Sequence, residues 1–166
     1  MLPENSILLT RKIEDSRSLL IEYIGQDQQR FDEVFQLFRQ DQNRINQIVT
    51  GALLKVLREN PEWLQPHTRF LLQQIKSRQT SQSNCRNFLR LLITIKLSEA
   101  QQGELIDRCF ELLSNPVQPI AIRVFAIKNI LNYRKEYPEL IKEVRLSVSD
   151  PEDTLSAGMK SIMRKL

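Results

Sequence analysis

The sequence predicts an all-α fold, an α-α superhelix of about nine antiparallel helices, and three observations support this class. Only four glycines occur in 166 residues, and no two apolar runs are joined by a glycine-containing hairpin turn. Apolar residues recur at helical spacing along most of the chain. A Glu-apolar-apolar segment opens a new helical stretch at residues 62–64, 104–106 and 139–141, at offsets of 42 and 35 residues. Units of this size cannot bury their apolar faces alone, so they stack into a quasi-one-dimensional solenoid.

Capping residues and helix-ending residues predict the bounds of the first three helices. A helix over residues 6–24 ends before Gly25, which suits the left-handed position after a helix. Asp27 caps a second helix over 28–39. Asp41 caps a third helix over 42–58, and the following Asn60-Pro61 stops it, because a residue before proline avoids the α region.

Prolines also divide the middle of the chain. We interpret residues 61–65 as a turn whose Trp63 and Leu64 pack over the start of a fourth helix, 66–76. Pro66 is tolerated there because the first turn of a helix does not use its N–H. A fifth helix covers 83–97. Ser98 and Gln101 have capping-box spacing for a sixth helix, which Asn115-Pro116 ends.

The last three helices follow from prolines and acidic residues. A seventh helix begins near Pro119 and extends to about Glu136, and Pro138-Glu139 open an eighth. Residues 150–153 combine a cap, a first-turn proline and two acids, which predicts a ninth helix from there to the end of the sequence.

These helices predict one repeat domain over residues 1–166. It consists of a degenerate N-terminal repeat, three helix-pair repeats and a C-terminal capping helix, which span residues 1–40, 41–149 and 150–166.

Composition excludes several classes of protein. A net charge of +4 is mildly basic and is spread along the chain, unlike the dense positive charge of a dedicated nucleic-acid binder. No apolar run approaches the roughly 20 residues that span a bilayer, and residues 1–5 lack the order of a signal peptide. Cys85 and Cys109 lie on apolar helical faces, so we expect buried thiols and no disulfide. We therefore expect a cytoplasmic protein without a membrane partner.

The sequence contains no recognisable catalytic or metal-binding motif. His67 is the single histidine and, without a second histidine or a nearby cysteine, is expected to have a surface or capping role. The acidic pairs Glu14-Asp15 and Asp32-Glu33 are adjacent, so on a helix they diverge. No glycine-rich phosphate loop or nucleophile elbow occurs. We expect no enzyme activity, no cofactor and no metal.

One helix face recurs and carries a resemblance to a known family. The segment Ile122-Arg123-x-x-Ala126-x-x-x-Ile130, after the polar loop 113–116, is similar to the HEAT-repeat signature. The segment Cys85-Arg86-x-x-Leu89-x-x-x-Ile93 has the same pattern 37 residues earlier. Residues 44–166 resemble a group of small bacterial proteins of the ARM/HEAT superfamily with no established activity. The resemblance implies the solenoid fold, but its motifs specify packing and not chemistry.

Basic residues on the second helix of each repeat are the candidate binding residues. In the family that helix usually lines the inner surface of the solenoid, and the residues there are Lys76, Arg108, Lys142 and Arg145. Arg86 and Arg123 are expected to be structural, with hydrogen bonds to loop carbonyls or to an acid of the neighbouring repeat, and with buried aliphatic stems.

Two functions of different classes remain open. The first is a monomeric, non-enzymatic protein-interaction or scaffold module whose protein partner the sequence does not identify. The alternative is nucleic-acid binding, with or without the base-repair chemistry of the HEAT-like DNA glycosylases, for which Tyr133 and Tyr137 are the candidate stacking residues. A nucleic-acid binder loses affinity steeply with salt because phosphate contacts release counterions, whereas capture of a specific protein tolerates salt.

Overall fold

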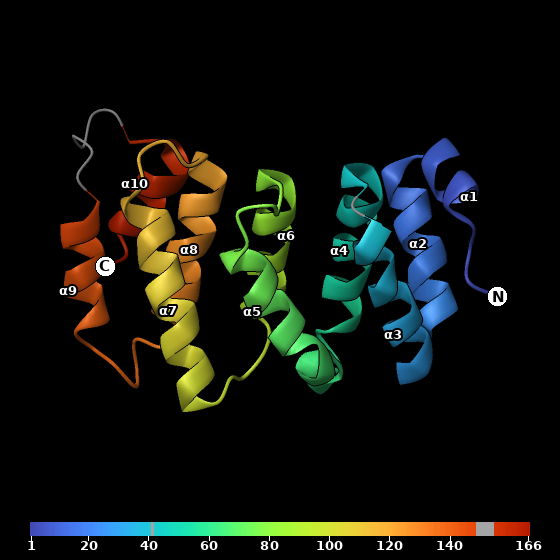
Figure 1. Cartoon of the computed structure of the whole chain (residues 1–166), viewed down its shortest axis with the longest axis horizontal. Helices are drawn as coiled ribbons and strands as arrows, with labels where there is room; N and C mark the ends of the chain where they lie inside the picture. The colour runs from blue at the N-terminus through green and yellow to red at the C-terminus, as the bar shows by residue number, and fades with distance from the viewer. Residues whose placement is uncertain (41, 149–154) are drawn as a thin grey trace. The chain divides into compact units, whose positions relative to one another are not determined.

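The computed structural model describes residues 1–40, 42–148 and 155–166, and every regular element in these ranges is helical (Figure 1). The predicted all-α class is therefore confirmed. The chain divides into two compact units, Met1–Thr68 and Arg69–Leu166, each with its own buried apolar residues. The predicted repeat boundaries at 40 and 149 stay a prediction.

The first unit is built around two long helices. α2 packs against α3 and α4, and α1 packs against α2 and α4. The side chains of Leu20, Phe31, Ile48 and Leu53 are fully buried in its core. The elements of this unit are α1 (Asn5–Thr10), α2 (Ile13–Ile24), α3 (Gln28–Gln36), the 3-10 helix η1 (Leu37–Gln40), α4 (Asn43–Val56) and the 3-10 helix η2 (Pro61–His67).

The predicted helix over 6–24 is wrong in one respect, because it is two helices. Arg11 and Lys12 are extended, with ψ of 166° and 149°. Tertiary hydrogen bonds compensate for the helical bonds that this break removes. The hydroxyl of Ser16 donates to the carbonyl of Leu8 at 2.8 Å, and the guanidinium of Arg44 donates to the carbonyl of Arg11 at 3.0 Å.

The predicted signals around the second and third helices are mostly confirmed. Gly25 has a positive φ of 53°, and the carboxylate of Asp27 accepts hydrogen bonds from the backbone N–H groups of Gln29 and Arg30. The second helix tightens into η1 for its last turn. The predicted cap Asp41 lies outside the described residues.

The proline-rich junction is more helical than predicted. Residues 61–67 form the 3-10 helix η2, and Pro66 lies inside it, so the following α-helix begins at Thr68. Trp63 and Leu64 are buried as predicted. The ring of Trp63 meets that of Phe31 edge-on, with 5.8 Å between the ring centroids.

The second unit is centred on α8, which packs against α6, α7, α9 and α10. Its core contains the fully buried side chains of Leu89, Leu105, Leu113 and Ala126. α7 and α8 lie side by side in Figure 1. The helices of this unit are α5 (Thr68–Lys76), α6 (Gln82–Leu92), α7 (Glu99–Ser114), α8 (Ile120–Asn132), α9 (Leu140–Ser147) and α10 (Ala157–Met163).

Two helices of this unit end earlier than predicted. The fifth predicted helix, to residue 97, ends at Leu92, and the seventh, to residue 136, ends at Asn132. Side chains replace the helical bonds that are lost. The amide of Asn132 donates to the carbonyl of Ile93 at 3.3 Å, and the guanidinium of Arg134 donates to the carbonyl of Leu131 at 2.8 Å.

Two other helices of this unit begin at a residue whose side chain caps the helix. Ser98 and Gln101 form the predicted capping box. The start signal at 150–153 lies outside the described residues. Within 155–166 the last helix begins at Ala157, where the hydroxyl of Ser156 accepts from the N–H of Met159 at 3.2 Å, so the helix is shorter than predicted.

Both cysteines are buried, as predicted. Loss of hydration raises the pKa of Cys85 to about 11 and raises the pKa of Cys109 still further above its usual range. Neither thiol is therefore ionised near neutral pH. Among the described residues, no helix is long and apolar enough to cross a membrane.

Candidate functional site

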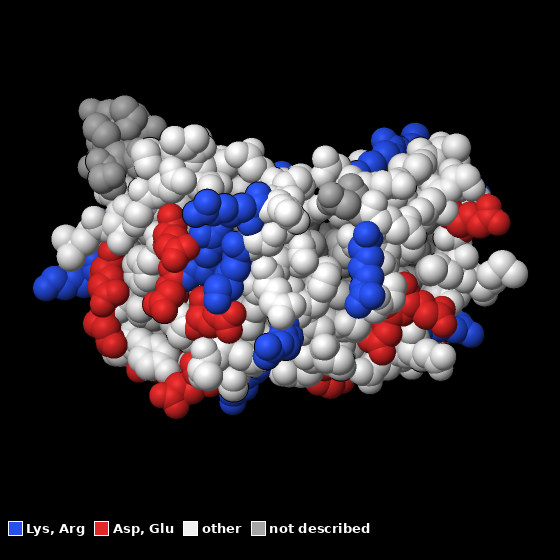
Figure 2. All heavy atoms as spheres, in the orientation of Figure 1, with Lys and Arg blue, Asp and Glu red and all other residues white. Residues whose placement is uncertain are grey.

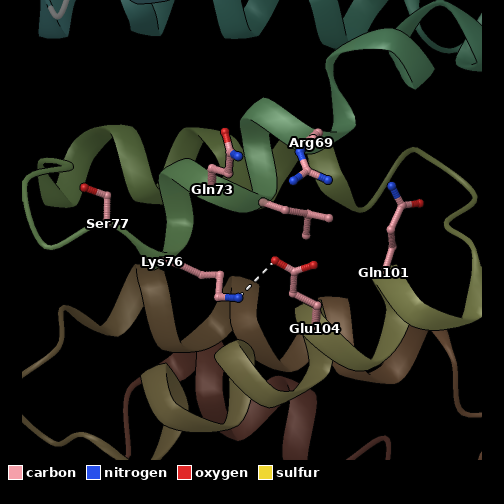
Figure 3. A pocket seen from close by; sticks show the side chains of 7 residues that line it. Arg69, Gln73, Lys76, Ser77, Gln101 and Glu104 are labelled. Carbon is pink, nitrogen blue, oxygen red and sulfur yellow. Dashed lines mark hydrogen bonds and ion pairs between the residues drawn. The ribbon is translucent and has the colours of Figure 1, made fainter.

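A polar groove runs between α5 and α7 (Figure 3). Its larger part is a cavity of about 500 Å³, and a neighbouring hollow of about 280 Å³ shares Lys76 and Glu104 with it. We call the two together the α5–α7 groove. Its lining residues are Arg69, Leu72, Gln73, Lys76, Ser77, Gln101, Glu104, Asp107, Arg108 and Glu111.

Helical periodicity explains why α5 presents polar side chains to the groove. Leu71 and Ile75 are buried in the core of the unit. Arg69, Gln73 and Lys76 follow one another at intervals of four and three residues, which places them on one face of the helix. Figure 3 shows these side chains on the side of α5 that lines the cavity.

The facing helix, α7, follows the same rule. Leu105, Cys109 and Leu112 are buried. On the other side, four of the residues that line the groove recur at intervals of three and four residues, and they are Gln101, Glu104, Arg108 and Glu111. One amphipathic pattern on each helix therefore builds both walls.

Two cations connect the walls in different ways. The ammonium of Lys76 lies 3.0 Å from a carboxylate oxygen of Glu104, and the two side chains are 52% and 37% exposed. Arg108 is only 23% exposed; its Nε donates to the carbonyl of Ile75 at 2.8 Å and its Nη1 lies 2.6 Å from the carboxylate of Glu111. Arg108 thus binds a carbonyl of the last turn of α5, where carbonyls lack a helical partner.

Charges of both signs line the groove. Arg69, Lys76 and Arg108 are interspersed with the acidic residues Glu104, Asp107 and Glu111. Figure 2 shows blue and red side chains close together over α7. A phosphate track needs an excess of positive charge, so this groove is better suited to polar and mixed-charge ligands.

The structure brings together only two of the four predicted binding residues. Lys76 and Arg108 both line the smaller hollow of the groove. Lys142 and Arg145 are exposed on α9 and are not among the residues that line it. In the sequence, Glu104 was noted only as the first residue of a recurring Glu-apolar-apolar segment. Its spacing of three and seven residues to Asp107 and Glu111 was the signal that an acidic face accompanies the basic one.

Of the two arginines predicted to be structural, one is confirmed. The Nε of Arg123 donates to the carbonyl of Leu113 at 3.0 Å, and Arg123 is 6% exposed. For Arg86 the predicted bond is not made by Nε, which is buried without a hydrogen-bond partner among the described residues.

The surface or capping role predicted for His67 is wrong. Its ring stacks on that of Phe35, with 3.9 Å between centroids, and its Nε2 lies 2.6 Å from the carboxylate of Asp32. The side chain is only 11% exposed. The 3-10 turns of η2 carry the ring onto α3, which the local sequence did not reveal. Among the described residues, no group of three or more potential ligands is arranged to hold a metal ion.

The chain has helices that pair in sequence order, arginines that bind carbonyls at helix ends, and a polar groove between two helices. Together these features define an α-helical repeat protein. The family model of the HEAT repeat domain matches residues 6–166, and the chain belongs to this family. The match begins well before residue 44, where the resemblance in the sequence began. No curated protein and no solved structure matches the chain. HEAT repeats generally mediate protein–protein interaction and are typically non-enzymatic scaffolds.

Proposed function

We propose that the chain is a non-enzymatic protein-interaction module whose α5–α7 groove holds a segment of a partner protein. The observation that carries this proposal is the groove itself, a polar channel between two neighbouring helices in a family that generally mediates protein–protein interaction. Lys76 and Arg108 are its proposed binding residues, with different roles.

The chemistry of the groove suits a peptide chain. The amide side chains of Gln73 and Gln101 each offer both donors and an acceptor, which match the N–H and C=O groups of an extended segment. Lys76 and Glu104 form an exposed ion pair, and such pairs contribute only about 0–1 kcal/mol. A partner that offers a carboxylate to Lys76 and a cation to Glu104 therefore replaces this pair at small cost.

The main role that we propose for Arg108 is to hold the two walls of the groove together, and contact with the partner is secondary. Most of its side chain is buried, and its Nε is already bonded to the carbonyl of Ile75. It fixes the end of α5 against α7, so the width of the groove depends on it. Arg69 is exposed and lines the same cavity, and we propose it as the cation that contacts the partner at the other end.

Lys142 and Arg145 on α9 stay proposed binding residues outside the groove. They are three residues apart and exposed, so one partner segment can contact both. Substitution of both by glutamate is expected to weaken capture of the partner. Unchanged capture of protein and of nucleic acid by this variant would remove α9 from the binding surface.

A pull-down with the full chain tests the function. Native lysate is passed over the immobilised protein at about 0.1 and 0.5 M salt, with and without nuclease, because screening separates phosphate contacts from packed interfaces. We expect a protein that is retained in all conditions and is lost from the variant Arg69→Glu with Lys76→Glu.

The control is Lys135→Glu, an exposed substitution outside the groove, which should retain the partner. Recovery of nucleic acid alone, released at high salt, would replace the proposal by the nucleic-acid alternative. Equal capture by the groove variant would show that the partner binds elsewhere.

A further inference from the structure

A second cavity lies outside the α5–α7 groove, where α8, α9 and α10 meet the residue that follows α6. It measures about 420 Å³. Its apolar lining is entirely aliphatic, and each of these side chains is only half-buried. They are Ile93, Leu131, Ile141, Ile162 and Leu166. We call this cavity the α8–α10 pocket.

The charged side chains that line the pocket are all basic: Lys128, Arg134 and Lys165. The guanidinium of Arg134 donates to the carbonyl of Leu131 at 2.8 Å, so it is held beside the aliphatic side chains, which we call the floor of the pocket. The basic side chains form its rim. The ammonium of Lys128 lies 4.9 Å from the ring centroid of Phe125. No acidic residue lines the pocket, which distinguishes it from the α5–α7 groove, where acids and bases alternate.

An aliphatic floor with a cationic rim is complementary to a ligand that has apolar side chains and carboxylates. Apolar burial supplies affinity at the centre of such an interface, while charges at its edge orient the ligand and accelerate association. The pocket is partly open to solvent. Small-molecule sites enclose most of their ligand, so an open pocket of this size is better suited to a segment that is anchored elsewhere in a larger protein.

We propose that the α8–α10 pocket binds an acidic, aliphatic segment of a protein. One or two leucine- or phenylalanine-sized side chains enter between Leu131, Ile141 and Ile162, and neighbouring carboxylates pair with Lys128, Arg134 and Lys165. This site is separate in residues and in chemistry from the α5–α7 groove, so the two proposals succeed or fail independently.

Three fluorescein-labelled peptides of 12 residues test the chemistry against the full chain by fluorescence anisotropy. The first contains only Glu, Leu and Phe, the second has Lys in place of every Glu, and the third has Ser in place of every Leu and Phe. We expect the first peptide to bind at least about tenfold more tightly than either of the others, because it alone matches both floor and rim. Equal binding of the lysine peptide would overturn the proposal.

Rim variants and NMR locate the binding. Lys128→Glu with Lys165→Glu should weaken the first peptide by about tenfold, since close like charges oppose the acids. The matched control, Lys135→Glu with Arg164→Glu, makes the same change of charge at exposed residues outside the pocket and should bind as wild type. Circular dichroism checks that each variant keeps its helices.

The floor residues are all Ile or Leu, so methyl NMR of the isoleucine and leucine side chains reports on them directly. The acidic peptide should shift the methyl signals of Leu131, Ile141 and Ile162 and leave Leu72, in the α5–α7 groove, unchanged. Shifts of Leu72 alone would overturn this inference and favour the groove. Absence of methyl shifts, or wild-type affinity of the rim variant, would also overturn it.

Discussion

At the scale of single residues, arginine side chains join the helices by binding carbonyl groups at helix ends. Arg44, Arg108 and Arg123 donate to the carbonyls of Arg11, Ile75 and Leu113, at 3.0, 2.8 and 3.0 Å. The carbonyls at a helix end lack helical donors, so a charged donor from another helix is valuable there. These three arginines therefore join helices through carbonyl groups, whereas Nε of Arg86, on the same recurring face as Arg123, makes no such bond among the described residues.

Arg123 gives the sharpest test of this role. Arg123→Ala removes the bond to Leu113 and the buried aliphatic stem, and we expect it to lower the free energy of unfolding by about 2–3 kcal/mol. Urea unfolding followed by circular dichroism measures this. Lys135→Ala, at an exposed residue, is the control. If both variants unfold at the same urea concentration as wild type, the carbonyl bond does not hold the helices together.

The buried thiols make stability depend on alkaline pH. Burial raises the pKa of Cys85 from 9.0 to about 11, and that of Cys109 also rises. The folded state favours the neutral thiols, so their contribution is complete below pH 9 and is lost as pH rises from about 9 towards 11. We expect the free energy of unfolding to fall between pH 9 and 11, and to fall less in Cys85→Ala with Cys109→Ala. An identical pH dependence in both proteins would contradict the burial of the thiols.

At the scale of helices, capping signals were predictable and helix breaks were not. Asp27 and Ser98 cap their helices through groups within three residues, so the local sequence is sufficient to find them. The break at Arg11 depends on Arg44, 33 residues away, and the end of α6 depends on Asn132, 39 residues from Ile93. A periodic apolar pattern continues through both positions, so it predicted helices that were too long.

The sequence predicted single residues of the candidate site but not how they come together. Lys76 and Arg108 were candidates because each lies on the second helix of a predicted repeat. Their proximity, and the pairing of Lys76 with Glu104, depend on how α5 meets α7. The α8–α10 pocket was not predicted, because its lining comes from four separate segments of the chain.

The packing of α2 on α4 depends on a glycine. A Cβ at Gly51 would overlap Nε of Arg17, so Gly51→Ala must displace that guanidinium. In a helix, alanine is normally favoured over glycine by about 1 kcal/mol. We expect Gly51→Ala to stabilise the chain by about that amount in an Arg17→Ala background, and by less when Arg17 is present. Urea unfolding of the four proteins of this double-mutant cycle measures the coupling; equal effects in both backgrounds would contradict the close contact.

At the scale of the whole molecule, the chain is a HEAT repeat protein in which each of two compact units has its own core. The second unit presents two different surfaces, a mixed-charge groove between α5 and α7 and an aliphatic pocket with a basic rim beside α10. Repeat proteins bind through extended surfaces with a few anchoring residues, so two chemically distinct sites are consistent with one interaction module.

Site-specific photo-crosslinking tests the central proposal most directly. A benzophenone side chain at Gln73 places the probe in the α5–α7 groove, and the same probe at Lys135 is the control outside it. In native lysate at about 0.5 M salt, where most electrostatic contacts are screened, we predict a crosslink to a protein segment from Gln73 only. Arg69→Glu with Lys76→Glu should abolish that crosslink. Equal labelling from both positions, or a crosslink that persists in the groove variant, would contradict the account.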